Sequence, residues 1–252
     1  MSDTYRLIQI SDCHLFADRD KVGYQGINPY RSLQQVLIKL RTLEPDCVLL
    51  SGDISGDESA ASYQHFLTLW DQYCPAVKLL SLAGNHDATD RWQQAFAATH
   101  SLTEHALNPQ GWRLHCLPAR FVGTRGEIAT ADIEQLIARL QQHSAQHHIV
   151  ALHHPIQNAN VWMDKHALIN PEVLTPLLQQ PNLKLILHGH VHTARHIKVG
   201  QVDVLACPST CWQWGNTAEF SVVEEPPGMR LIELDDEGQF SHSLHFVANS
   251  VV

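Results

Sequence analysis

The sequence predicts an α/β fold that forms one domain with two kinds of sheet. Short runs of Leu, Ile and Val alternate with amphipathic helical patterns as far as residue 191, which is typical of βα units packed on a sheet. Beyond residue 191, strand patterns follow one another with only turns between them. No linker or repeat divides the 252 residues, so we expect residues 1–252 to share one core.

Each element of the alternating part follows from its local pattern. Short continuous apolar runs predict buried strands at residues 5–10, 47–50, 77–82, 149–152 and 183–187. The first helix between them carries Leu33, Val36, Leu37 and Leu40 on one face and is stopped by Pro45. Further helices are expected at residues 60–73, 91–98, 131–142 and 171–178.

The last part of the chain contains strands only. They are expected at residues 196–199, 202–206, 229–234 and 240–247, with turn signals at Gly200-Gln201 and Asp236-Glu237-Gly238. We expect residues 193–252 to complete a second sheet.

Composition excludes several classes of function. Apolar residues make up 44% and charged residues 17%, which is a globular balance, and the net charge of −9 argues against nucleic-acid polymers and anionic membranes as partners. No apolar run approaches the ~20 residues of a membrane span, and the opening residues 1–4 lack a basic leader. Six cysteines without a CxxC pair predict reduced thiols, so we expect a cytoplasmic protein; its oligomeric state stays open.

Polar side chains follow five of the predicted strands. These strands run into the segments Asp12-Cys13-His14, Gly52-Asp53, Gly84-Asn85-His86-Asp87, His153-His154-Pro155 and Gly189-His190-Val191-His192. The carboxyl ends of strands in α/β sheets form the crevice in which ligands bind. Carboxylate, amide and imidazole groups that converge there are best explained by metal ions.

Each segment alone has a simpler explanation. Asp12 and His14 could be a helix cap and a surface histidine, Asp53 and Asn85-His86-Asp87 could be turns, and the later histidines could lie in the core or on the surface. It is their joint occurrence at strand ends that favours metal binding. A shared carboxylate can hold two divalent ions ~3.5–4 Å apart. The pair of cations lowers the pKa of bound water toward ~7 and leaves a positive field that attracts a phosphodiester.

The five segments together resemble the signature blocks of the calcineurin-like metallophosphoesterases, over residues 8–192. This resemblance implies a four-layer α/β-β/α sandwich, with mixed sheets flanked by helices and a two-metal site at the strand ends. It also implies the ligands of the two metals. Those of the first metal would be Asp12, His14, Asp53 and His192. Asp53 would bridge to the second metal, whose other ligands would be Asn85, His153 and His190.

Further roles are implied by the same resemblance. His86, beside Asn85, would contact the phosphoryl group and protonate the leaving oxygen, while His154 would support the ligand His153. Side chains expected to contact the substrate are those of His14, Asp53, Asn85, His86, His153 and His192. The implied cofactor is a pair of metal ions per chain, with iron favoured and manganese or zinc as alternatives, because the ligands include no thiolate.

A narrower resemblance covers nearly the whole chain. Residues 61–66, 162–166, 208–211 and 227–231 resemble the bacterial class III cyclic-nucleotide phosphodiesterases. One departure is Pro118, which stands where members of that group often carry aspartate. The implied reaction is hydrolysis of 3′,5′-cyclic AMP to 5′-AMP by metal-bound hydroxide, in line with the 3′-oxygen.

The base-binding part of the site is less defined by the sequence. Residues 160–167 and 209–214 are expected to line the nucleotide pocket, where Trp162, Trp212 and Trp214 offer stacking faces for a base or pack between the sheets. Another phosphodiester or pyrophosphate is an alternative substrate, such as a glycerophosphodiester, a nucleotide-linked lipid precursor or a 2′,3′-cyclic nucleotide. A non-catalytic, partner-binding scaffold is a more remote alternative.

Overall fold

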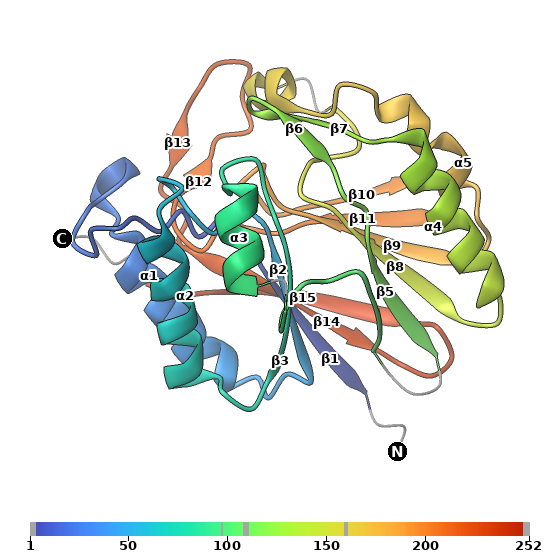
Figure 1. The fold of residues 1–252 in the computed structure, drawn as a ribbon, viewed down its shortest axis with the longest axis horizontal. Helices are drawn as coiled ribbons and strands as arrows, with labels where there is room; N and C mark the ends of the chain where they lie inside the picture. The colour runs from blue at the N-terminus through green and yellow to red at the C-terminus, as the bar shows by residue number, and fades with distance from the viewer. Residues whose placement is uncertain (1–3, 97, 108–110, 159–160, 249–252) are drawn as a thin grey trace.

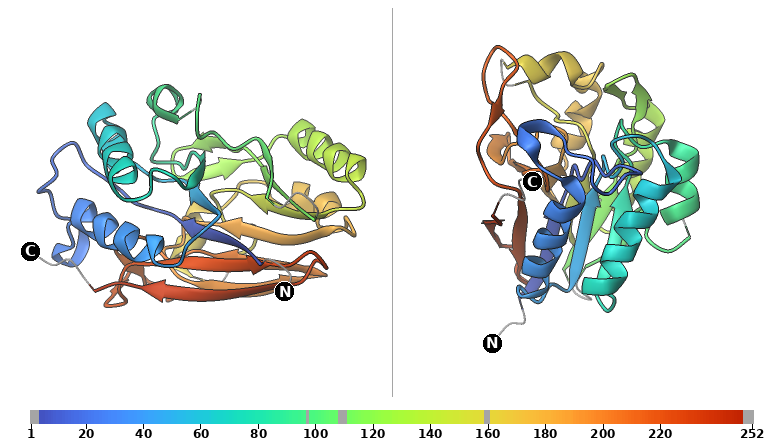
Figure 2. Two further views of the ribbon diagram at one scale, coloured as in Figure 1. Left: turned by 90° about the horizontal axis from the view of Figure 1, so that it is seen from below. Right: turned by 90° about the vertical axis from the view of Figure 1, so that its left-hand side faces the viewer.

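The computed structural model describes residues 4–96, 98–107, 111–158 and 161–248. Residues 97 and 160, which fall within an expected helix and an expected pocket loop, lie outside this part of the chain, as do residues 1–3 and 249–252. Two large sheets stack on each other, and helices cover their outer faces (Figures 1 and 2). This arrangement confirms the predicted α/β sandwich with mixed sheets.

The first sheet has five strands in the order β15-β14-β1-β2-β3. The bounds of these strands are β1 Tyr5–Ile10, β2 Cys47–Ser51, β3 Lys78–Leu82, β14 Gly228–Leu234 and β15 Phe240–Phe246. Strands β1 to β3 are parallel, whereas β14 pairs antiparallel with β1 and β15 pairs antiparallel with β14. The parallel part of this sheet therefore delivers three strand ends to the same edge.

The second sheet has six strands in the order β10-β11-β9-β8-β5-β4. Their bounds are β4 Glu104–Ala106, β5 Trp112–Cys116, β8 His147–Ala151, β9 Leu183–His188, β10 Arg195–Val199 and β11 Val202–Ala206. The inner strands β5, β8, β9 and β11 are parallel, and the two edge strands are antiparallel. Two small hairpins lie outside the large sheets, one formed by β6 Arg120–Val122 and β7 Arg125–Glu127, the other by β12 Gln213–Trp214 and β13 Val222–Val223.

Helices form the outer layers. The first sheet is covered by α1 Pro29–Arg41, α2 Ala60–Tyr73 and α3 Thr89–Phe96, and the second by α4 Thr130–Gln142, η3 Pro171–Leu174 and α5 Thr175–Leu178. Short 3-10 turns occur at η1 Tyr24–Gly26 and η2 Trp162–His166. Helix α1 begins where the Asn28 side chain accepts a hydrogen bond from the Arg31 N–H, with Pro29 in the first turn. No helix in the described ranges is long and apolar enough to cross a membrane.

The segment at residues 171–178 departs from the predicted single helix. It forms a 3-10 turn followed by one short α-helical turn. Pro176, in the middle of this stretch, lacks a backbone N–H, so a continuous ladder of helical hydrogen bonds cannot form through it.

The prediction that residues 193–252 complete the second sheet is wrong for its last two strands. Only β10 and β11 join the second sheet, whereas β14 and β15 extend the first. The reason is that β14 is apolar on both faces: Met229 and Leu231 pack toward the helices, and Ile232 and Leu234 pack into the core between the sheets. Such a strand is suited to an interior position beside β1.

Candidate metal centre

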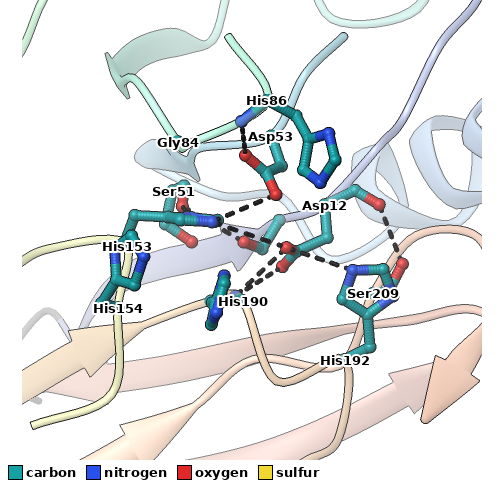
Figure 3. Close-up of polar contacts among 12 residues, drawn as sticks. Asp12, Ser51, Asp53, Gly84, His86, His153, His154, His190, His192 and Ser209 are labelled. Atoms are coloured by element: carbon teal, nitrogen blue, oxygen red, sulfur yellow. Dashed lines mark hydrogen bonds and ion pairs between the residues drawn. The ribbon is translucent and has the colours of Figure 1, made fainter. Parts of the chain in front are cut away.

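The predicted site residues lie on loops that follow β1, β2, β3, β8 and β9, all at one edge of the two stacked sheets. Figure 3 shows the side chains of Asp12, Asp53, His153, His190 and His192 directed toward a common centre. All five are at most 5% exposed. The fold therefore gathers carboxylates and imidazoles in a site that is largely shielded from water.

A first group of ligand atoms belongs to Asp12, His14 and His192, and all of them lie within 4.8 Å of one another. Nε2 of His192 is 3.3 Å from Oδ1 of Asp12 and 3.0 Å from Nε2 of His14. Burial, together with the nearby His192, lowers the pKa of His14 to about 3. A neutral imidazole of this kind presents a lone pair that can bind a metal ion.

A second group consists of Asp53, His153 and His190, again with all ligand atoms within 4.8 Å. Asn85 follows β3, and its buried Oδ1 has no hydrogen-bond partner within the described residues. The same holds for Nε2 of His153, which lies 3.2 Å from Oδ2 of Asp53. Buried polar atoms that lack a hydrogen-bond partner are costly, so these two atoms indicate a missing ligand at this position.

Asp53 lies between the two groups. Its Oδ2 is 3.2 Å from Nε2 of His153 and 3.8 Å from Nε2 of His14, while its Oδ1 accepts a hydrogen bond from the His86 backbone N–H at 2.8 Å. Burial alone would raise the pKa of Asp53, but His153 and His14 hold it well below its usual range. Burial lowers the pKa of His153, but the charge and hydrogen bond of Asp53, together with Asp12 and the Ser51 carbonyl, outweigh it and raise this pKa to about 9. Asp53 is thus the ionised group best placed to bridge two cations.

Backbone carbonyls fix the orientation of three of the imidazoles. Their partners are the carbonyls of Trp212 for His192, Ser51 for His153 and His166 for His190, at 2.9, 2.8 and 3.0 Å. Because a carbonyl only accepts, the nitrogen facing it carries the proton and the other nitrogen is left with its lone pair. Nε2 of His192 and Nδ1 of His190 are therefore left with lone pairs, as expected of metal-binding histidines. Nε2 of His153, which faces the ionised Asp53, would present its lone pair once a bound cation displaces its proton.

The backbone at the site is strained. Positive φ angles of 44° to 69° occur at Asp12, His14, Asp53, His190 and His192. Residues other than glycine rarely adopt this region, and such conformations persist where surrounding structure enforces them, often at functional sites. This backbone conformation lets each side chain point into the centre close to the end of its strand.

Glycines in the motifs allow the loops to approach the carboxylates closely. A Cβ atom at Gly84 would lie 2.2 Å from Oδ1 of Asp53, and one at Gly189 would lie 2.8 Å from Oδ2 of Asp12. Both contacts are far inside the normal packing distance, so these positions admit only glycine without rearrangement.

Replacing Gly84 with alanine is expected to weaken metal binding by about 10- to 100-fold, the usual effect of disturbing the support of a ligand. The added methyl group would push the Asp53 carboxylate away from its position. Metal retained after dialysis, measured by elemental analysis, checks the prediction. Gly111→Ala is the matched control, since its Cβ would meet its nearest neighbour at 3.8 Å. Equal retention by the two variants would contradict it.

Asp87 is a structural member of the site to which the sequence reasoning assigned no role. Its carboxylate accepts hydrogen bonds from the backbone N–H groups of Gly84, Ile54 and Ser55, at 2.8 to 3.1 Å. It thereby ties the loop after β3 to the loop after β2, which carry Asn85 and Asp53. Burial and the nearby Asp53 raise the pKa of Asp87 to about 7. The only feature of the sequence that could have indicated this role is the place of Asp87 at the end of the Gly-Asn-His-Asp segment.

The two remaining histidines of interest lie beside the ligands. His86 is exposed, and its ring packs edge-on against His14 with the ring centroids 5.1 Å apart. His154 is buried, lies 4.3 Å from the His190 ring and donates from Nε2 to the carbonyl of Thr124 at 3.1 Å. His154 thus packs against the histidine of the second group rather than entering the centre itself.

All three tryptophans proposed as stacking faces surround the site, and none belongs to the core between the sheets. Trp212 stacks on His14 and Trp214 on His192, with ring centroids 5.5 and 4.8 Å apart. Trp162 donates from Nε1 to the Gly215 carbonyl at 3.2 Å. A cavity of about 110 Å³ lies over the ligands between these aromatic groups and His86.

Comparison with known families agrees with this geometry. The family profile of the calcineurin-like phosphoesterases matches residues 5–194. The chain belongs to the calcineurin-like phosphoesterase family. This family uses a dinuclear metal centre, and the oxygen and nitrogen donors of the two groups, with their unpartnered Asn85 Oδ1 and His153 Nε2, fit such a centre.

Relatives of this calcineurin-like phosphoesterase cover almost its full length. It is 31% identical to the 3′,5′-cyclic adenosine monophosphate phosphodiesterase CpdA of Escherichia coli K12, over 97% of this chain and 90% of that protein. Identity to the CpdA of Pseudomonas aeruginosa is also 31%, over 97% and 91% of the two chains. A protein of Ruthia magnifica described as a probable cyclic nucleotide phosphodiesterase is 29% identical, over 94% and 97%.

Solved structures share the fold of this calcineurin-like phosphoesterase. A dimetal phosphatase from Danio rerio superposes with a TM-score of 0.66 at 14% identity, over 97% of this chain and 99% of that one. GAP50, described as the anchor in the inner membrane complex of Plasmodium, superposes with a TM-score of 0.60 at 13% identity, over 99% and 87%. The fold is thus found in proteins with different described roles, and the site must decide the activity.

Proposed function

We propose that this phosphoesterase hydrolyses 3′,5′-cyclic AMP to 5′-AMP with two metal ions per chain. The observation that carries the proposal is the pair of buried ligand groups on either side of Asp53, beneath a cavity bounded by His86 and tryptophan side chains. The names of the relatives support a cyclic nucleotide as the substrate class. A cytoplasmic location stays a prediction.

Seven side chains are assigned as ligands of the two metal ions. The first metal would be held by Asp12, His14, Asp53 and His192, and the second by Asp53, Asn85, His153 and His190. When bound, two such cations supply a positive field and water of lowered pKa. Iron is favoured, with manganese and zinc as alternatives, because the donors are oxygen and nitrogen only.

The protein side chains orient the diester and handle the proton. The phosphate would sit in the 110 Å³ cavity, which is lined by His14, Asp53, Asn85, His86 and His192. His153, beside Asp53, is a further expected contact. Water, which loses a proton to solvent, attacks phosphorus opposite the 3′-oxygen, and the bond from phosphorus to that oxygen breaks; His86 regains its proton from solvent after the step. An imidazole N–H of His86, which lies at the open rim, donates the proton that the leaving oxygen needs. Asn85, beside it, would orient one phosphate oxygen.

One observation favours a second candidate, a diester with an apolar group. A cavity of about 500 Å³ reaches His153 from another direction and is lined by side chains such as Leu82, Trp92, Leu117 and Phe121. A nucleotide-linked lipid precursor or a glycerophosphodiester with an apolar chain could use this cavity. A non-catalytic scaffold is disfavoured, because six of the seven side chains assigned to the metals lie in two groups of closely spaced donor atoms, and the seventh, Asn85, has a buried Oδ1 without a partner in the described residues.

A substrate panel tests the proposal. The purified protein, loaded separately with iron, manganese or zinc, would be given 3′,5′-cyclic AMP, 3′,5′-cyclic GMP, 2′,3′-cyclic AMP, an aryl phosphodiester and an acylated glycerophosphodiester. We expect kcat/KM for 3′,5′-cyclic AMP to exceed that for the non-nucleotide diesters by about tenfold or more. The product should be 5′-AMP, and elemental analysis should find two ions per chain. If 3′,5′-cyclic AMP were the poorest substrate, the proposal would be wrong.

A further inference from the structure

A second cavity opens from the candidate centre on the side of His14. Its volume is about 490 Å³, which is within the size range of pockets that bind small organic ligands. It shares His14, His86 and Trp214 with the smaller cavity over the metal ligands, so the two cavities adjoin each other. We propose that this larger cavity is the nucleobase subsite, an inference that rests on the proposed hydrolysis of a cyclic nucleotide.

The walls of this cavity offer aromatic surface and a cation. Tyr24 is 47% exposed, and its ring lies 5.0 Å from that of Trp214 and 5.3 Å from that of Trp212, edge-on in both cases. Lys21 and Phe16 also line the cavity, and Nζ of Lys21 lies 3.9 Å from the centre of the Phe16 ring. Aromatic rings and cations both bind the π-face of a base.

Trp212 also indicates a ligand at this position. It is 4% exposed, one face of its ring stacks on His14 at an interplanar angle of 19°, and its Nε1–H has no hydrogen-bond partner in the described part of the chain. Leaving a buried donor unpaired is unfavourable. A ring nitrogen or a carbonyl of a bound base would supply the acceptor.

The position of Tyr24 is built into the fold rather than left to a free loop. A Cβ atom at Gly23 would lie 2.1 Å from the Trp212 ring, so only glycine lets the chain lie directly on that ring. The Gly23 N–H donates to the Ile27 carbonyl at 2.8 Å, which closes the turn that presents Tyr24. Gln25 donates from Nε2 to the carbonyl of Val222 at 3.4 Å and joins this turn to β13. The aromatic wall is therefore preorganised.

The chemistry of the walls predicts how bases are distinguished. Among the described residues that line the cavity, there is no Asp, Glu, Asn or Gln side chain. Donors such as Lys21 Nζ and Trp212 Nε1 meet acceptor atoms that adenine and guanine both possess, and stacking accepts either base. We expect kcat/KM for 3′,5′-cyclic AMP and 3′,5′-cyclic GMP to agree within about tenfold. A preference above about a hundredfold for either would overturn this assignment of the walls.

Tyr24→Ala tests the subsite in the metal-loaded protein. Removing one stacking partner should raise the KM for 3′,5′-cyclic AMP and the Kd for 5′-AMP by about tenfold. Calorimetric titration with inorganic phosphate, which lacks a base, should give an unchanged Kd. Phe246→Ala is the matched control, because Phe246 is a similarly exposed aromatic residue, at 39%, on β15 and away from the cavity. Equal effects of Tyr24→Ala and Phe246→Ala on 5′-AMP binding would overturn the proposal.

A second variant controls for local misfolding that Tyr24→Ala could cause at the surface. Gly23→Ala keeps every aromatic ring but displaces the turn from Trp212, so it should weaken 5′-AMP binding and spare phosphate binding.

The proposed reaction and the proposed nucleobase subsite can be refuted separately. Tyr24-dependent binding of 5′-AMP without turnover of 3′,5′-cyclic AMP would support the subsite and refute the proposed reaction. Turnover to 5′-AMP with a KM unaffected by both variants would refute the subsite alone.

Discussion

Replacing Asp53 with asparagine is expected to reduce kcat/KM by more than about 100-fold, beyond what changes behind the ligands usually cost. Asp53 is 2% exposed, belongs to the second group of candidate ligands and lies 3.8 Å from His14 of the first, so both proposed metal positions would lose the same ligand at once. The variant also removes the carboxylate that raises the pKa of His153. Elemental analysis should find fewer than two ions per chain in this variant.

The control for this experiment is Asp203→Asn, on β11. Asp203 pairs with His196 and Lys198 at the outer edge of the second sheet, so its loss removes one charge without touching the centre. Its activity and metal content should match those of the unaltered protein. Full metal content and near-normal turnover in Asp53→Asn would show that the bridging role is wrongly assigned.

Replacing His86 with glutamine is expected to lower kcat by about 10² to 10⁴-fold, the usual contribution of a general acid. Its ring lies at the rim of the cavity rather than at the buried core of the centre, and among the described residues no other exposed imidazole packs against His14. The loss should be largest for substrates with poor leaving groups and small for an aryl diester, since an aryl oxide departs without protonation. Metal content should stay unchanged, and elemental analysis checks this.

An alternative role for His86 is open to the same measurement. Its ligand atom lies within 4.8 Å of those of His14 and Asp53, so it could itself bind a metal ion. Loss of metal from His86→Gln together with loss of activity on the aryl diester would identify a ligand instead of an acid. His196→Gln, an exposed histidine on β10, is the control for the substitution itself.

Many elements of the fold could be predicted from periodicity because their burial is simple. Helix α2 occupies residues 60–73 as expected, and β1, β2 and β9 agree to within one residue. Strand β5 was not among the elements expected from apolar runs, because Arg113 and His115 interrupt its apolar residues. Its His115 is nevertheless fully buried, with Nε2 2.8 Å from Nδ1 of His148 on β8. Because such a pair is polar and yet buried, a strand that contains it cannot be recognised from hydropathy alone.

By itself, the sequence determined the types of element, the chemistry of the ligands and the rule that they follow strand ends. The end of a strand can be recognised from local sequence. A glycine or histidine at that point can therefore be identified without knowledge of the segments that it contacts in the folded protein. Only the tertiary structure decided that β14 joins the first sheet, that Asp87 ties two ligand loops together, and that Tyr24 faces Trp214. Those outcomes depend on contacts between segments far apart in the chain, whose free energy is set by mutual burial and shape rather than by local pattern.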